Sequence, residues 1–112
     1  DYNTNINKYC KQYKCKENIT LKHLLTHTSG TTDGNGYLGM EPQIPAKQNL
    51  QLNIDIITGK SYSKPLNITE KAGKKFNYSG AGFQVVQQVV EEITGKRLYK
   101  LMEQFIFTPL KI

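Results

Sequence analysis

The sequence predicts a mainly α-helical chain with one or two short strands. Apolar residues recur at spacings of three and four in several segments, which is the pattern of amphipathic helices. Gly59 and Gly95 each follow such a segment, where a glycine commonly ends a helix. Residues 66–70 instead alternate apolar and polar side chains, as a strand does. Short helices and long loops favour a subdomain that packs on something else over a self-sufficient bundle.

Two short helices are expected in the first thirty residues. Residues 1–13 are predicted to form a weak helix, with its apolar positions at Ile6, Tyr9, Cys10 and Tyr13. Thr20 is a good N-cap for the second helix, because its hydroxyl can accept from a free amide of the first turn. Ile19 and Leu24 are placed as a hydrophobic staple. The expected buried face of this helix is Leu21, Leu24 and Leu25.

The middle of the chain is predicted as loop, helix and strand. Residues 31–43 are rich in glycine and polar side chains and are expected to form a surface loop. A helix is expected over residues 46–58, with an inner face of Leu50, Ile54 and Ile57 and with Gly59 at its end. Turns are expected at residues 60–65 and 71–74, on either side of the strand at residues 66–70.

A longer helix is expected from Phe83, after a tight turn of small residues at 79–82. Its apolar stripe is predicted to be Phe83, Val86, Val90 and Ile93, with Val85 and Val89 beside it. Tyr78 directly precedes this helix and is therefore held by a rigid element. A last helix with Leu98, Leu101, Met102, Phe105 and Ile106 is expected to end at Pro109.

Size and charge indicate one domain with a basic surface. The chain has 112 residues, the length of a single domain, and a formal net charge of +6. Nearly all of the positive charge is lysine, whereas base and phosphate recognition favour arginine, so nucleic acid is not the expected partner. The lysines around residues 8–22 and 60–75 are interpreted as solvated surface, with a binding patch as the alternative. No apolar run approaches membrane-spanning length, and no signal peptide is visible.

The cysteines and histidines do not form a metal-binding pattern. Cys10 and Cys15 are not ideally placed for a disulfide bridge if their segment is helical. A zinc site from these two cysteines with His23 and His27 would need unlikely geometry, so no metal is expected.

Two segments resemble signatures of one enzyme family. Residues 19–30 read ITLKHLLTHTSG, and residues 75–83 read KFNYSGAGF. The first is similar to the ITIRHLLTHTSG signature of the serine β-lactamase-related family, which holds class C β-lactamases, D,D-peptidases and penicillin-recognising esterases. The second resembles the family's Phe-x-Tyr-Ser element, and residues 107–110, FTPL, resemble its later IFxPLGM motif. The resemblance covers nearly the whole chain in the right order.

The resemblance implies acyl transfer by a serine nucleophile. In this family the nucleophile and a lysine share a Ser-x-x-Lys turn, and a tyrosine supplies a second proton-transfer group. Tyr78 matches that catalytic tyrosine, and Ser79 and Gly80 match neighbouring substrate-binding positions. No cofactor is implied. Residues 1–112 would then be an internal fragment, the helical subdomain of the α+β β-lactamase/D,D-peptidase fold, with the Ser-x-x-Lys part before it and the C-terminal sheet part after it.

Two features depart from the family pattern. Gly80 stands where the motif often has asparagine, which leans away from a true class C β-lactamase. Ser61 and Lys64 have the Ser-x-x-Lys spacing, but they lie between the two signatures and Pro65 disfavours a helix there, so this stretch is interpreted as a turn. The chain by itself is therefore expected to be inactive.

Each candidate residue also has a purely structural interpretation. Tyr78 would be an ordinary core tyrosine if the resemblance were set aside. His27 could be a general base, but a histidine ending a short helix is more often a capping or packing residue. Ser79 could line the cleft or cap the following helix.

The sequence therefore predicts part of an extracytoplasmic serine hydrolase. Its expected partners are a small-molecule or peptidoglycan-type substrate, such as a β-lactam, a D-Ala-D-Ala-type peptide or an ester, and the rest of the parent chain. Two alternatives stay open: a non-catalytic basic module that binds nucleic acid or an anionic surface, and a degenerate penicillin-binding-like protein without turnover.

Overall fold

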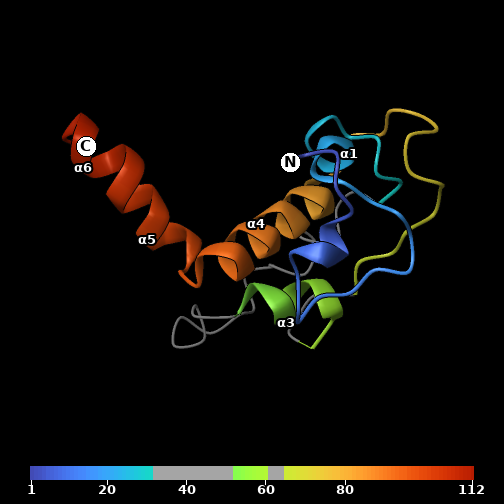
Figure 1. Cartoon of the computed structure of the whole chain (residues 1–112), viewed down its shortest axis with the longest axis horizontal. Helices are drawn as coiled ribbons and strands as arrows, with labels where there is room; N and C mark the ends of the chain where they lie inside the picture. Colours follow the sequence, from blue (N-terminus) through green and yellow to red (C-terminus); the bar gives the residue numbers. More distant parts are fainter. Residues whose placement is uncertain (32–51, 61–64) are drawn as a thin grey trace, which may run out of the picture.

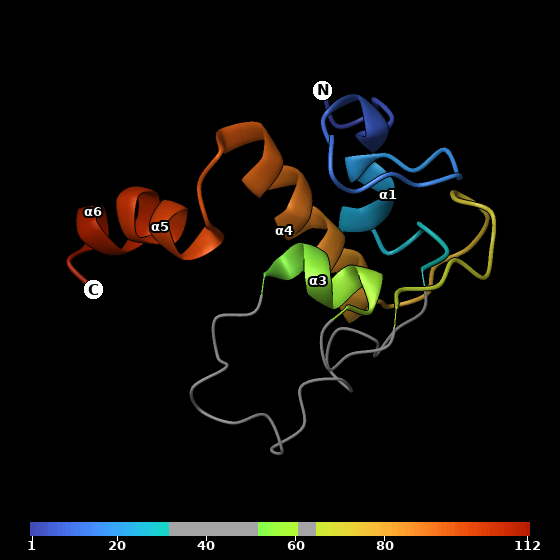
Figure 2. The ribbon, with the colours of Figure 1, turned by 90° about the horizontal axis from the view of Figure 1, so that it is seen from below.

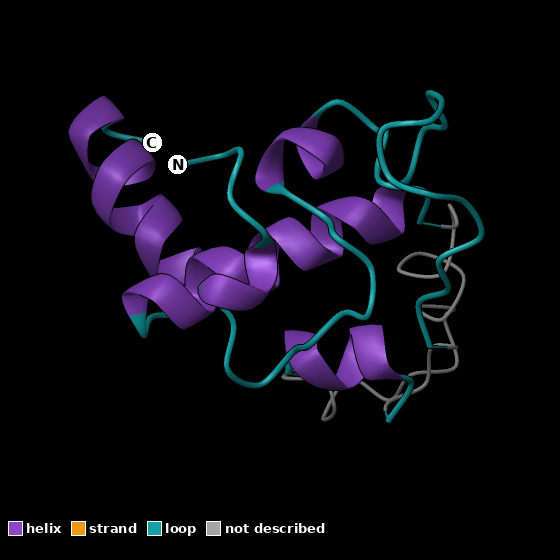
Figure 3. Ribbon diagram, turned by 45° about the vertical axis from the view of Figure 1, so that its right-hand side comes forward, coloured by secondary structure: helices purple, strands orange, loops and turns teal. Residues whose placement is uncertain are grey.

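The computed structural model describes residues 1–31, 52–60 and 65–112. The elements of these residues are η1 (Ile6–Lys8), α1 (Leu21–Leu25), α3 (Asn53–Thr58), α4 (Gly80–Thr94), α5 (Leu98–Met102), the π-helical η3 (Glu103–Phe107) and α6 (Thr108–Leu110). Helix α4 crosses the middle of the molecule, α1 and α3 pack on it, and α5 and α6 lead away to one side (Figure 1). The described residues contain two isolated β-bridges. They form no strand, and Figure 3 accordingly shows only helices and loops. The mainly helical prediction is confirmed.

Helix α4 buries a different face from the predicted one. It begins at Gly80, because the Ser79 hydroxyl accepts the N–H of Gly82 (2.9 Å) and caps a turn that was expected to lie outside the helix. The buried row is Ala81, Val85 and Val89, whereas Phe83 and Ile93 are 43% and 55% exposed. The predicted stripe is thus wrong by about one residue, or roughly 100° of rotation.

The core joins the N-terminal segment to α1 and α4. Its buried members are Ile6, Cys10, Cys15, Ile19, Leu24, Val85 and Val89. Both cysteines are free. The cluster draws on residues far apart in sequence, so the N-terminal segment is held by tertiary packing.

The predicted helix at residues 1–13 is reduced to the single 3₁₀ turn of η1. The reason is that its backbone donors bond elsewhere. The N–H of Ile6 donates to the carbonyl of Ile19 (2.9 Å), and the N–H groups of Lys11 and Gln12 donate to the Glu92 carboxylate of α4 (2.6 and 2.7 Å). These long-range bonds satisfy groups that a helix would have paired internally.

Helix α1 begins as predicted. The Thr20 hydroxyl accepts the N–H of His23 (3.2 Å), and His23 Nδ1 accepts the N–H of Thr20 (3.3 Å), which completes a capping box. Leu24 and Ile19 are buried. Leu25 was expected on the buried face, but it is exposed, because it directly follows the buried Leu24 and therefore lies about 100° away from it around the helix.

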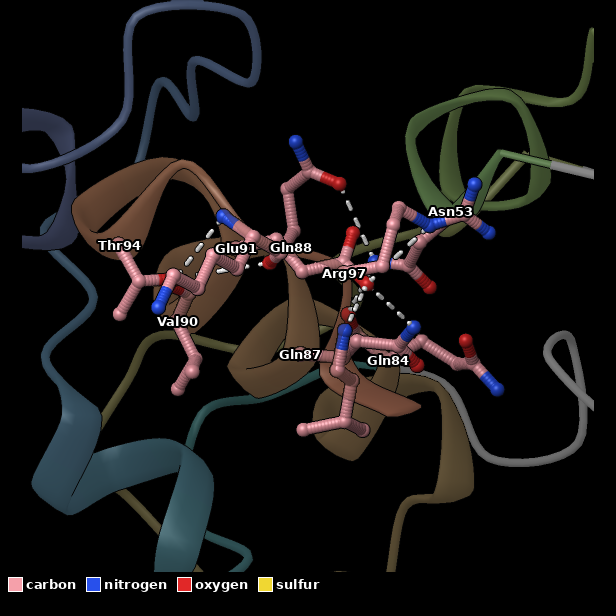
Figure 4. A network of polar contacts seen from close by, with 10 residues as sticks. Asn53, Gln84, Gln87, Gln88, Val90, Glu91, Thr94 and Arg97 are labelled. Carbon is pink, nitrogen blue, oxygen red and sulfur yellow. Dashed lines mark hydrogen bonds and ion pairs between the residues drawn. The ribbon is translucent and has the colours of Figure 1, made fainter. Parts of the chain in front are cut away.

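Helix α3 lies along α4 and is tied to it by Asn53. Figure 4 shows the Asn53 Nδ2 amide donating to the Gln84 carbonyl (2.8 Å) and to Gln88 Oε1 (3.2 Å). Ile57 is buried as predicted, and Gly59 ends the helix with φ of +75°. The first half of the helix predicted at residues 46–58, with Leu50, lies outside the described residues.

The segment after α3 follows the predicted pattern only in part. Side chains at 66–70 alternate between half-buried and exposed, and among the described residues this segment pairs through one β-bridge, between Ile68 and Thr31. The turn at residues 71–74 is present, with Gly73 at φ of +83°. Most of the loop at 31–43 and of the turn at 60–65 lies outside the described residues.

The C-terminal arm leaves the body after Gly95, which ends α4 with φ of +67° as predicted. Figure 2 shows α5 and α6 directed away from α1 and α3. Pro109 does not end the last helix. It lies inside α6, which continues from η3 with helical backbone angles at Phe107 and Thr108 and has Lys111 as its C-cap residue. None of the described helices is long and apolar enough to cross a bilayer.

Candidate active site around Tyr78

Tyr78 lies in the extended segment directly before α4, with its side chain open to solvent. The residue is 62% exposed, so its phenol is not enclosed in apolar side chains. A core tyrosine would be enclosed in this way, so that alternative does not fit. The hydrogen bonds and ion pairs among the described residues do not involve the Tyr78 hydroxyl. The phenol is therefore accessible to an external group.

His27, just after the end of α1, contacts Tyr78 and the residues on either side of it. The N–H of Asn77 donates to the His27 carbonyl (2.8 Å), and the N–H of Ser79 donates to His27 Nδ1 (3.0 Å). The imidazole and the Tyr78 ring lie 4.5 Å apart between centroids, tilted by 32°. The tyrosine is thus held at the residues before and after it and at its ring. These contacts are those of a packing residue, in agreement with the structural interpretation of His27.

Two further aromatic rings surround the same imidazole. Phe76 meets His27 edge-on at 5.8 Å, and Phe83 lies 5.2 Å away on the first turns of α4. Such contacts are favourable beyond area burial by about 0.5–1.5 kcal/mol each. Phe83 therefore packs on the site instead of the core, which explains why the predicted stripe of α4 failed at its first residue.

Ser79 is part of a buried chain of hydroxyl groups. Only 1% of the residue is exposed, and its Oγ shares a hydrogen bond with Thr31 Oγ1 (2.8 Å), which shares another with Ser29 Oγ (2.9 Å). The structure places Ser79 in the cap of α4, and its expected contact with substrate stays a prediction. Thr31 was expected in a surface loop, yet it is buried in this chain.

Gly80 and Gly82 form the buried first turn of α4. An ideal Cβ built on Gly82 would lie 3.1 Å from Thr31 Oγ1 and 3.4 Å from Ser79 Oγ, so a side chain there would press on the hydroxyl chain. Gly80 is buried as the first residue of the helix. Its contribution to substrate binding, which could come only from its backbone, stays a prediction.

Charge near the site comes from lysines on the approach to Tyr78. Lys75 Nζ lies 2.7 Å from Glu70 Oε1, and the hydrogen bond from Lys75 lowers the pKa of the Glu70 carboxyl. Ser61 and Lys64 lie outside the described residues. Within residues 1–31, 52–60 and 65–112, no three histidine, cysteine or acidic side chains gather in a way that could hold a metal ion.

Two hollows of the described part lie away from Tyr78. One is lined by the C-terminal half of α4 together with Tyr9, Asn53 and Arg97, and the other by α5 and its neighbours. Neither is lined by the predicted site residues. The candidate site is thus an exposed surface around one aromatic cluster, formed where the two sequence signatures meet.

Solved structures share this fold. The penicillin binding protein from Bacillus halodurans superposes with a TM-score of 0.73 and 25% identity, over 96% of this chain and 31% of that one. The D-stereospecific amidohydrolase from Streptomyces sp. gives a TM-score of 0.71 and 21% identity, over 99% of this chain and 35% of that one. The fold therefore belongs to the penicillin-binding-protein-like class.

Sequence comparison gives the family itself. The chain is 33% identical over 98 residues to lovastatin esterase from Penicillium rubens, across 84% of this chain and 23% of that protein. The family model described as Beta-lactamase matches residues 1–112. The chain belongs to the beta-lactamase family of serine hydrolases. It spans about a quarter to a third of the length of these relatives.

Proposed function

We propose that the complete protein is a serine acyl-transfer hydrolase in which Tyr78 is a proton-transfer group. The observation that carries this proposal is the exposed phenol fixed in front of α4, at the position where the family motif has its tyrosine. Accessibility and a rigid support are both needed for a group that must meet a substrate.

The chemistry requires a charged environment for the phenol. A free phenol has a pKa near 10 and is a weak base at neutral pH, so a neighbouring ammonium group must favour its ionised form. The lysine of the family's Ser-x-x-Lys turn would provide that charge. The phenolate would then take the serine proton during attack on the acyl carbon and return it to the leaving group, while backbone amides stabilise the oxyanion.

The substrate class proposed is an ester, a D-amino-acid amide or D-Ala-D-Ala-type peptide, or a β-lactam. Support comes from the names of the relatives, which include an esterase, a D-stereospecific amidohydrolase and a penicillin binding protein. All of these substrates undergo the same acyl transfer. An extracytoplasmic location is proposed with them, because the family acts there.

The test is acylation of the complete protein by a fluorescent penicillin and by p-nitrophenyl esters. Tyr78→Phe is expected to lower the acylation rate by roughly 10²–10⁴-fold, the usual contribution of a proton-transfer group. Tyr99→Phe is the matched control, since Tyr99 is equally exposed on α5. Equal rates for both variants would refute the role of Tyr78. The isolated chain of residues 1–112 is expected to remain unlabelled, and labelling at Ser61 would show that the nucleophile is misassigned.

A further inference from the structure

His27 adopts a left-handed backbone conformation that residues other than glycine take uncommonly. Its φ is +56°, in the left-handed region, and it directly follows the C-cap residue of α1, Thr26. Glycine is the usual residue there because it has no Cβ to make this conformation unfavourable, and asparagine follows because its short side chain can hydrogen-bond locally. A histidine kept at such a position points to a use for its side chain.

That side chain makes two contacts that converge on Tyr78. Nδ1 accepts the N–H of Ser79 at 3.0 Å, and the ring packs on the Tyr78 ring at 4.5 Å. A backbone N–H can only donate, so Nδ1 must be unprotonated and the neutral ring carries its proton on Nε2. The bond holds the N-cap residue of α4, and the ring fixes the side chain of the residue before it.

We propose that His27 is a positioning residue, which sets the orientation of the Tyr78 phenol for acyl transfer. This inference rests on the proposed function of Tyr78. We assign His27 no proton transfer, because its two contacts with the Tyr78 segment, the hydrogen bond from the Ser79 N–H and the ring packing, are both structural supports. A displacement of about 1 Å in a reacting group can lower a rate by roughly 100-fold, so loss of this support is expected to show in catalysis.

Two substitutions distinguish the effect of the His27 side chain from the effect of its left-handed backbone. His27→Gly removes the ring and the acceptor while relieving the left-handed backbone. His27→Asn also suits the left-handed backbone, and its Oδ1 lies close to the place of Nδ1 and can accept the Ser79 N–H. The matched control is His23→Asn, because His23 Nδ1 likewise accepts a backbone N–H, that of Thr20, but has no ring contact with Tyr78.

The experiment measures acylation of the complete protein by a fluorescent penicillin. His27→Gly is expected to lower the acylation rate constant by about 10- to 100-fold with an unchanged concentration for half-saturation. His27→Asn is expected to recover most of the rate, and His23→Asn to keep it. Wild-type acylation in His27→Gly would overturn the proposal. If that variant does not fold, His27→Gln replaces it, since its acceptor lies one bond too far; equal rates for Gln and Asn would then overturn the proposal.

A fluorine signal tests orientation independently of activity. In protein labelled with 3-fluorotyrosine, the Tyr78 resonance is the one that disappears in Tyr78→Phe. It is expected to shift and broaden in His27→Gly and to return towards its wild-type position in His27→Asn. An unchanged resonance in His27→Gly overturns only the proposal that His27 positions Tyr78, and leaves the proposed function of Tyr78 standing. Unchanged acylation in Tyr78→Phe instead overturns the proposed function, and with it the catalytic purpose given to His27.

Discussion

Glu92 fastens the N-terminal segment to α4, and we predict that Glu92→Gln releases it. One oxygen of this carboxylate accepts the N–H groups of Lys11 (2.6 Å) and Gln12 (2.7 Å). The other accepts the N–H of Tyr13 (3.3 Å) and the side-chain amide of Gln88 (3.0 Å). One anion on α4 thus satisfies three consecutive backbone donors that the expected helix at residues 1–13 would have paired differently.

The expected magnitude follows from these bonds. A hydrogen bond to a charged group contributes about 1.5–3 kcal/mol, roughly twice a neutral one. A glutamine oxygen can still face Lys11 and Gln12, but both bonds lose their charge, and the new amide group faces the donors of Tyr13 and Gln88. We expect a loss of about 2 kcal/mol in local stability, which corresponds to about 30-fold faster exchange of these amide protons.

The assay is amide hydrogen exchange at Lys11 and Gln12 in the wild-type protein and in Glu92→Gln at pH 7. Glu103→Gln is the control, because Glu103 forms only an exposed ion pair with Lys100 (3.3 Å) and such pairs contribute little. Exchange at the wild-type rate in Glu92→Gln would refute the reasoning.

The same prediction has a pH dependence of defined sign. Burial raises the pKa of Glu92, but hydrogen bonds from Gln12, Gln88, Lys11 and Tyr13 outweigh it and leave the pKa below the ordinary value of 4.5. A lowered folded-state pKa means that the stabilisation is complete above the unfolded value and is lost as the pH falls through the folded one. The difference in protection between the two proteins should therefore be complete above pH 4.5 and shrink as the pH falls below it through the folded-state pKa, and a difference that grows on acidification would contradict the electrostatic account.

Three further predictions concern stability and reactivity. Val85→Ala should lower the free energy of unfolding by about 1–3 kcal/mol in a denaturant titration, whereas Ile93→Ala, on the exposed face of α4, should change it by less than about 0.5 kcal/mol. Gly95→Ala should cost about 1 kcal/mol in the same titration, because no neighbouring atom blocks a Cβ and only the left-handed backbone opposes it. Burial, followed by the charge of Glu92, raises the pKa of the Cys10 thiol from 9.0 to about 12. A thiol reagent at pH 8 should therefore react with Cys10 only after unfolding. Because the unfolded thiol ionises first, the free energy of unfolding should fall as the pH rises above 9.

The caps and ends of the helices could be predicted from the sequence. The glycines after α3 and α4 both adopt the left-handed conformation that ends a helix, and Thr20 caps α1 with the expected hydroxyl. Each of these features depends on groups within a few residues of one another. A sequence pattern contains all the information that such a feature needs.

Features that depend on residues far apart in the sequence, such as the buried face of α4, could not be predicted. Helix α4 has valines in adjacent pairs at 85–86 and 89–90, so two neighbouring rows satisfy the helical period equally well. The choice between them is made by partners such as Ile6 and Leu24, which are far away in the sequence. The same holds for residues 1–13. Their amphipathic spacing predicted a helix, but the N–H groups of Lys11 and Gln12 bond to the carboxylate of Glu92 instead.

The candidate site was predicted in part. Tyr78 was identified from its motif, and its exposure is compatible with that prediction. The support around it was missed, because nothing in the sequence says that Thr31 reaches Ser79 or that Phe83 turns from the core to His27. The stretch His27-Thr28-Ser29-Gly30 indicated only the end of a short helix.

The contact between His27 and Ser79 gives a physical reason for the two signatures to occur together. The first signature ends α1 with a left-handed histidine, and the second begins α4 with a serine N-cap. The histidine supplies a hydrogen-bond acceptor, and the serine supplies the backbone donor that it accepts. His27 accepts the amide of Ser79, while Ser79 and Ser29 satisfy the buried hydroxyl of Thr31 between them. Loss of either motif would remove hydrogen bonds from this buried group of hydroxyls, each of which contributes about 0.5–1.5 kcal/mol. The tyrosine segment is therefore ordered by a contact between distant parts of the chain, and a change in one signature should disturb the other.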